Sequence, residues 1–163
     1  MQPEARSAQR EAVQAHPLAE LLDCPAATAS MLNGSARSID VGGGGVVFRQ
    51  NAPCDGLYVI VSGTFMRKAE RMETRLTLGP ARPGDLVELA AALGGVQHTF
   101  TLVAQTAGSV LLLPIESLNR AFQSYPPLRM QLLEELAREV SRAYYTCCLQ
   151  SGMKSRRHNT GTA

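Results

Sequence analysis

The sequence predicts an α+β fold: an antiparallel β-roll of the jelly-roll kind, preceded by short helices and followed by one long helix. The main evidence is a central region, from about residue 38 to residue 114, in which short β-branched or alternating runs are separated by glycine-rich turns roughly every ten residues. On both sides of this region, apolar residues recur at helical spacing instead. The length of 163 residues suits one domain with appendages.

The composition is typical of a globular protein that is not a membrane protein. Hydrophobic residues make up 45% of the chain, and the formal net charge is only +2, with both signs interspersed. No apolar run approaches the roughly 20 residues that span a bilayer, and the polar N-terminus has no apolar signal core behind it. We therefore expect a cytoplasmic protein without membrane association.

One domain with two appendages is expected along the chain. Residues 1–17 lack a strong apolar face and are predicted to form an N-terminal arm, which His16-Pro17 interrupts. Residues 18–149 are predicted to form the domain. Residues 150–163 are predicted to be a flexible basic tail, because the basic cluster from Lys154 to His158 is too local for a nucleic-acid footprint.

Short helices are predicted at the start of the domain. Apolar residues from Leu18 to Leu32 fall at helical intervals, which Asp23-Cys24-Pro25 breaks. Asn33-Gly34 then closes the last of these helices as a C-terminal cap would. We expect them to cover the roll as a lid.

Six strands are predicted in the central region. Gly63 stands between two of them, where a glycine marks a kink or a bulge. The glycine run Gly42–Gly45 is interpreted as a flexible turn, because no Lys-Ser or Lys-Thr follows it as in a phosphate-binding loop. The predicted strands are Val46–Arg49, Tyr58–Ser62, Thr64–Lys68, Arg75–Leu78, Phe100–Gln105 and Val110–Leu113.

A short amphipathic helix and then a long helix are predicted after Pro114. The long helix begins at Pro127 and ends near Leu149, a length of about 33 Å, which exceeds what a small roll needs for its own cover. One apolar stripe of this helix is therefore a candidate dimer interface, although packing of the stripe on the roll remains an alternative. The stripe comprises Leu128, Leu132, Leu136, Val140 and Tyr144.

Two segments carry a resemblance to a known family. The stretch from Gly45 to Gly63 has an early strand, a turn at Asp55-Gly56 and the pattern Y-x-I-x-S-G. The stretch from Arg82 to Ile115 has a glycine turn, a short helix and two further strands in the same order. Together with the long helix, these segments resemble the cyclic nucleotide-binding effector domain of the Crp/Fnr family over roughly Ala19 to Cys148.

The resemblance implies a ligand site at the segment that we call the cassette, residues 84–90. In members that bind a cyclic nucleotide, a glutamate of the cassette takes the ribose hydroxyl, and a later arginine with a hydroxyl residue after it holds the phosphate. Glu88 stands at the glutamate position and His98 at the arginine position. The implied ligand-binding residues are Gly84, Asp85, Leu86, Val87, Glu88, Leu89, Ala90, His98 and Thr99.

The departures from the family pattern disfavour tight binding of cyclic AMP or cyclic GMP. Val87 replaces the glycine before the glutamate, and His98 replaces a permanently charged guanidinium that would hold phosphate with two hydrogen bonds. Truncating a buried charged anchor costs about 2–5 kcal/mol, or roughly 30-fold to several-thousand-fold in affinity. A cyclic nucleotide therefore stays a candidate ligand, and no other cofactor is predicted.

Other chemistry is not indicated by the sequence. No nucleophile and base, and no paired carboxylates, stand in a catalytic arrangement, so no enzyme activity is expected. Cys24, Cys54, Cys147 and Cys148 have no C-x-x-C spacing and are predicted to be reduced structural thiols. The three histidines are scattered along the chain, so no metal site is predicted.

The leading hypothesis is a regulatory module of the Crp/Fnr transcription-regulator type. It would sense a small-molecule effector or a redox state through the roll and transmit the signal through the long helix, with a homodimer as the expected assembly. Residues 151–163 are too short for a helix-turn-helix, so direct sequence-specific DNA binding is not expected. Two alternatives stay open: a functional cyclic AMP- or cyclic GMP-binding protein, and a ligand-free partner that forms mixed dimers with full-length regulators.

Overall fold

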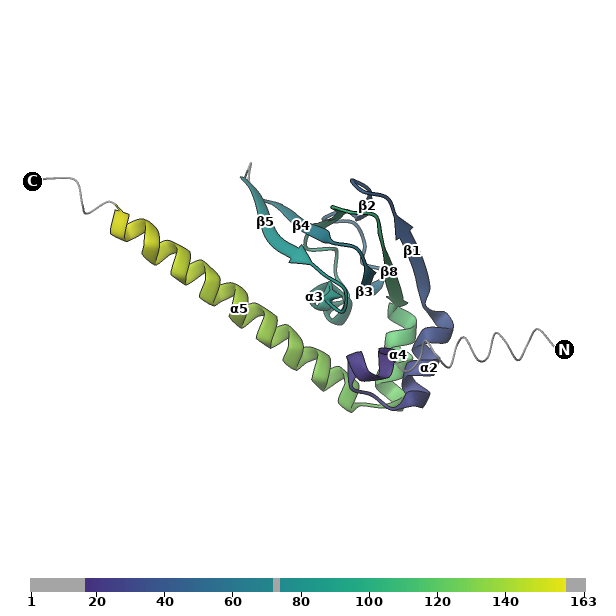
Figure 1. Ribbon diagram of the computed structural model, residues 1–163. Helices are drawn as coiled ribbons and strands as arrows, with labels where there is room; N and C mark the ends of the chain where they lie inside the picture. Colours follow the sequence, from purple (N-terminus) through teal and green to yellow (C-terminus); the bar gives the residue numbers. More distant parts are fainter. Residues whose placement is uncertain (1–16, 72–73, 158–163) are drawn as a thin grey trace, which may run out of the picture.

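The computed structural model describes residues 17–71 and 74–157, and for residues 71, 74–77 and 150–157 it describes the backbone alone. Eight strands form two antiparallel four-stranded sheets, in the orders β1-β8-β3-β6 and β2-β7-β4-β5 (Figure 1). The strands are β1 (Arg37–Val41), β2 (Val46–Phe48), β3 (Gly56–Ser62), β4 (Phe65–Arg71), β5 (Thr74–Ala81), β6 (Leu86–Val87), β7 (Thr101–Ala104) and β8 (Gly108–Pro114). The predicted β-roll is confirmed.

Helices lie at one end of the roll and along its side (Figure 1). A short helical segment over residues 17–22 precedes the first labelled helix. The others are α2 (Ala26–Ser35), α3 (Leu89–Gly94), α4 (Ile115–Ser124) and α5 (Pro127–Arg157). Within the described residues no helix is long and apolar enough to cross a membrane.

The predicted strands all appear, and two more join them. The alternating run β1 pairs with β8 at one edge, and the two-residue β6 pairs with β3 at the other. Near Gly63 the structure has both a bulge in β3, between Ile60 and Ser62, and a turn that separates β3 from β4. Gly63 occupies this turn with a φ of +81°, which favours glycine.

Gly56 has a different role from the predicted one. Instead of supplying turn flexibility, it begins β3 at a point where a Cβ atom would collide with the carbonyl oxygen of Leu113 on β8. The glycine therefore allows the two central strands of one sheet to approach each other.

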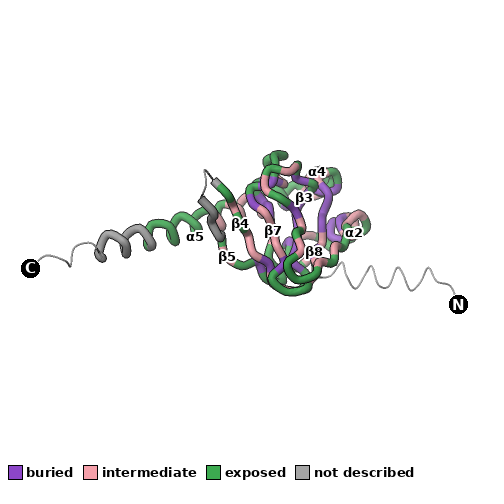
Figure 2. The backbone as a smooth tube through the Cα atoms, turned by 90° about the horizontal axis from the view of Figure 1, so that it is seen from above, coloured by how far each residue is buried: buried purple, intermediate pink, exposed green. Residues whose placement is uncertain are grey.

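Two hydrophobic clusters form the core. One fills the interior of the roll around Phe65, Leu102 and Val110. The other lies where the helices cover the end of the roll, and it includes Leu32 and Leu118. Figure 2 shows buried residues in the strands, α2 and α4, whereas residues 140–149 of α5 are exposed.

The residues of the predicted apolar stripe on the long helix lie in two different environments. Leu128 and Leu132 are 0% and 3% exposed in the helix-covered core, and Leu136 packs against it. Val140 and Tyr144 are 59% and 69% exposed. Residues four apart advance by about 40° around an α-helix, so the first and last members of this stripe lie about 160° apart.

The long helix continues past its predicted end, and both ends of the chain lie outside the described residues. The helix α5 continues to Arg157, past the predicted end near Leu149, so the first part of the predicted tail is helical. Residues 1–16 of the predicted arm and residues 158–163 of the predicted tail lie outside the described residues.

Replacing Leu132 with alanine is expected to lower the free energy of unfolding by about 2–5 kcal/mol, because it opens a cavity in the helix-covered core. Leu149→Ala is the matched control in the same helix. Leu149 is 64% exposed, so its truncation should change stability by less than about 0.5 kcal/mol. Chemical denaturation followed by circular dichroism measures both, and equal effects would show that α5 does not dock on the core.

Candidate functional site

The cassette is a tight turn followed by β6 and the first turn of α3. Gly84 has a φ of +91°, and its N–H donates to the Ile60 carbonyl at 2.9 Å. The Ile60 N–H donates to the Asp85 carbonyl at 3.0 Å, so both ends of this contact fix the turn against β3. Glu88 then has a φ of +72°, which is uncommon for a residue with a Cβ atom. Non-glycine residues with such a left-handed backbone conformation are often found at functional sites.

The Glu88 side chain points into the protein and is 0% exposed. Its Oε1 atom accepts hydrogen bonds of 3.1 Å from both the backbone N–H and the hydroxyl of Thr99. Burial raises the pKa of Glu88, and the Thr99 hydrogen bonds partly oppose this shift. The carboxyl group is therefore held inside the fold by Thr99, at the inner side of the pocket wall.

His98 lies next to Glu88 of the cassette and is 2% exposed. Its ring stacks on Phe48, with centroids 3.9 Å apart and planes 7° apart. Burial lowers the pKa of His98, although Asp55 opposes the shift, so the neutral imidazole is favoured. The ring is buried against Phe48 and is absent from the pocket wall, and the candidate ligand role of His98 stays a prediction.

A pocket of about 820 Å³ lies between the roll and α5. This volume lies within the range of about 300–1,000 Å³ for small-molecule sites. Its wall contains every predicted ligand-binding residue except His98. The opposite wall comes from α5, from Gln131 to Thr146, which the sequence did not associate with the ligand site.

The charges of the pocket wall are mostly negative. It contains three guanidinium groups, and each one is already bonded to a carboxylate. Arg67 on β4 meets Glu139 on α5 at 2.9 Å, and Glu135 accepts from Arg138 at 2.9 Å and from Arg142 at 3.0 Å. The carboxylates of the wall are those of Asp23, Asp85, Glu88, Glu134, Glu135 and Glu139. An anionic ligand would meet net repulsion here.

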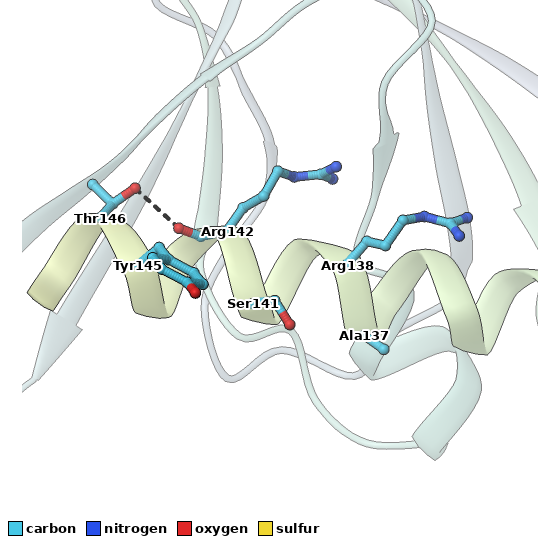
Figure 3. A pocket seen from close by; sticks show the side chains of 6 residues that line it. All are labelled: Ala137, Arg138, Ser141, Arg142, Tyr145 and Thr146. Atoms are coloured by element: carbon cyan, nitrogen blue, oxygen red, sulfur yellow. Dashed lines mark hydrogen bonds between the residues drawn. The ribbon is translucent and has the colours of Figure 1, made fainter.

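A second hollow of about 760 Å³ lies on α5 (Figure 3). In Figure 3 the Arg138 and Arg142 side chains extend to one side of the helix, whereas Ala137 and Ser141 lie toward the other. All the residues that line this hollow belong to α5. With only one wall, it lacks the enclosure of a small-molecule site.

Cys54 is the residue of this region that the sequence did not associate with the cassette. It is 8% exposed, and its sulfur lies within 4.8 Å of ligand atoms of Glu88 and His98. The three residues are far apart in the sequence and have no motif spacing. Only the pairing of their segments in the folded chain brings them together.

Comparisons with known proteins agree with this architecture. The sequence model of the cyclic nucleotide-binding domain matches residues 39–125, more than half of the chain. The chain therefore belongs to the cyclic nucleotide-binding domain family, which confirms the resemblance seen in the sequence. No curated protein sequence matches the chain at a significant level.

Several solved structures share the fold. The sensor domain of the transcriptional regulator DNR from Pseudomonas aeruginosa is 19% identical with a TM-score of 0.66, and the match covers 98% of this chain and 97% of that one. The Thermus thermophilus catabolite activator protein is 22% identical with a TM-score of 0.67, over 81% of this chain and 59% of that one. The regulatory domain of Toxoplasma gondii PKA, solved with cAMP, is 16% identical with a TM-score of 0.71, over 82% and 52%.

Thr99→Val should lower the free energy of unfolding by about 1–3 kcal/mol, because the buried Glu88 carboxyl group loses its hydroxyl donor. Thr146→Val is the control, since its hydroxyl bonds to the Arg142 carbonyl on the exposed helix surface. Urea denaturation of both variants measures the difference. A Thr99 variant as stable as the control would mean that the hydroxyl contributes nothing to holding Glu88 inside the fold.

Proposed function

We propose that this chain is a regulatory sensing module in which a small effector enters the pocket between the cassette and α5. The observation that carries this proposal is that one pocket has the cassette on one wall and the long helix on the other. An occupant that contacts both walls would favour one position of α5 over others, and a ligand shifts an equilibrium only through such differential contacts.

The charge of the pocket favours a neutral or cationic effector over a cyclic nucleotide. The pocket is large enough for a nucleotide, so size does not exclude one. The cyclic phosphate, however, would need a free cation, and Arg67, Arg138 and Arg142 are each engaged with a carboxylate of α5. Freeing Arg67 would leave Glu139 unpaired and close to the phosphate, whereas Glu135 would keep one guanidinium if either Arg138 or Arg142 were freed.

Titration calorimetry at low salt is expected to detect no binding of cyclic AMP or cyclic GMP at ligand concentrations up to about 1 mM. A Kd of about 1 mM corresponds to a binding free energy of only about 4 kcal/mol. Adenosine is the matched control, because it keeps the base and the ribose and lacks the phosphate. Micromolar binding of cyclic AMP without binding of adenosine would contradict the proposal and establish the nucleotide-sensor alternative.

We further propose that α5 joins two copies of the chain through a stripe different from the one predicted. On the side away from the core, apolar residues follow the alternating three- and four-residue spacing of a coiled coil. The stripe, which we call the outer stripe, comprises Met130, Leu133, Ala137, Val140, Tyr144 and Cys147.

Exposure supports the outer stripe as the contact surface. Met130 and Val140 are each 59% exposed and Tyr144 is 69% exposed, although Val140 also lines the pocket between the roll and α5. The heptad spacing keeps these residues on one side, because it drifts by only about 20° per heptad in a straight helix. A second copy of α5 presents the same stripe and is therefore self-complementary.

Tyr144→Glu is expected to convert a dimer into a monomer, because it places a carboxylate at the centre of the outer stripe in each copy. Tyr145→Glu is the matched control, since Tyr145 is 70% exposed and lies about 100° around the helix. Light scattering coupled to gel filtration gives both masses. Equal masses for the two variants would remove the outer stripe from the interface.

A further inference from the structure

We propose that Cys54, Glu88 and His98 form a binding site for a divalent transition-metal ion, with Zn²⁺ as the best-matched ion. The thiol sulfur, one carboxylate oxygen and one imidazole nitrogen all lie within 4.8 Å of one another. This site lies on the inner side of the cassette, shares Glu88 with the wall of the proposed effector pocket, and does not depend on dimerisation.

Two unsatisfied atoms point to a missing ligand at this place. Glu88 Oε2 and His98 Nδ1 are both buried without a hydrogen bond of good geometry among the described residues, although the Phe100 backbone N–H lies close enough to the Glu88 carboxyl group to lower its pKa. They lie 3.8 Å apart, which is too far for a hydrogen bond between them. Buried polar atoms are nearly always satisfied in native proteins, so two facing atoms without partners require an explanation.

The same separation suits two ligands of one metal ion. Zinc bonds of about 2.0–2.3 Å in tetrahedral geometry place neighbouring ligand atoms about 3.3–3.7 Å apart. The 3.8 Å between Glu88 Oε2 and His98 Nδ1 is close to this value. The sulfur, within 4.8 Å, would need a movement of about 1 Å toward the ion.

Surrounding contacts hold the three side chains in place. The Cys54 thiol donates to the Gly56 carbonyl at 3.2 Å, a hydrogen bond that metal binding would replace. The Thr99 N–H and hydroxyl occupy Glu88 Oε1 and leave Oε2 turned toward His98. Phe48 stacks on the imidazole. The backbone joins the two segments, because the His98 N–H donates to Ala52 and the Asn51 N–H donates to His98, both at 2.9 Å. Such outer contacts orient metal ligands and tune affinity.

The charges of the ligand set match a divalent ion in a buried site. A Cys54 thiolate and a Glu88 carboxylate together carry two negative charges, which neutralise the ion, while His98 remains neutral. Binding requires the Cys54 S–H bond to break and release its proton to solvent. The mixture of sulfur, nitrogen and oxygen donors suits zinc, and three protein ligands leave one tetrahedral position for water or another small donor.

Cobalt is the most direct probe, because a cobalt–thiolate bond gives a charge-transfer band in the near ultraviolet. The experiment uses the full chain with Cys147 and Cys148 replaced by serine, in the presence of a phosphine reductant, since these exposed thiols are a competing site. We expect one Co²⁺ ion per chain with this band, and displacement of cobalt by added Zn²⁺.

Variants of the three ligands separate a metal site from a structural cluster. Cys54→Ser should abolish the band, whereas Cys24→Ser, at a half-buried thiol elsewhere, should keep it. Glu88→Gln keeps an acceptor for Thr99 and should weaken zinc binding strongly, which makes it the deciding variant if Cys54→Ser misfolds by circular dichroism. Thr99→Val should weaken binding by about 10- to 100-fold, as loss of an outer contact does.

The result that would overturn the proposal is equally specific. A chain without Cys147 and Cys148 that shows no cobalt band, or a band that survives in both folded Cys54→Ser and folded Glu88→Gln, would exclude this metal site. Competition with a chelating dye measures the zinc affinities, and none of these readouts depends on the effector or on the mass of the assembly.

Discussion

The inward position of the Glu88 carboxyl group is the constraint on which the site depends. A left-handed backbone at Glu88 turns the side chain under the cassette, where the Thr99 N–H and hydroxyl hold one oxygen. Burying a carboxyl group without partners is costly, so this arrangement ties the cassette to the segment that contains His98 and Thr99. One oxygen of the side chain that the family resemblance would assign to a ribose hydroxyl is thus engaged with Thr99, although Glu88 remains part of the pocket wall.

The helix α5 has two apolar faces in different environments. Leu128 and Leu132 complete the helix-covered core, which fixes the first turns of the helix against the rest of the chain. The salt bridge between Arg67 and Glu139, with side chains 22% and 35% exposed, then joins the roll to the middle of the helix at the edge of the pocket. Beyond this point the helix has no cover within the described residues, and its outer stripe is available to a second copy. A ligand between the roll and the helix would act where the helix passes from one environment to the other.

The sequence predicts the features that depend on neighbouring residues in the chain better than those that depend on contacts between distant segments. The β-roll follows from turn residues and from the alternation of apolar and polar residues, which act over a few positions. The strand β1, which was not predicted, has only a short alternating pattern. The stripe at four-residue spacing combined residues from two sides of the helix, because that spacing winds around the helix axis. The heptad spacing of the outer stripe was present in the sequence, but the burial of Leu128 and Leu132 had to be known before the two faces could be told apart.

The sequence by itself determined the fold class, the family and the cassette, because each of these depends on short runs of residues with a fixed order and spacing. Only the tertiary structure decided the direction in which Glu88 and His98 point, the pairing of Arg67 on β4 with Glu139 on α5, and the meeting of Cys54 with Glu88 and His98. The physical reason is that side-chain direction and charge pairing depend on contacts between segments far apart in the chain, and neither composition nor spacing records those contacts.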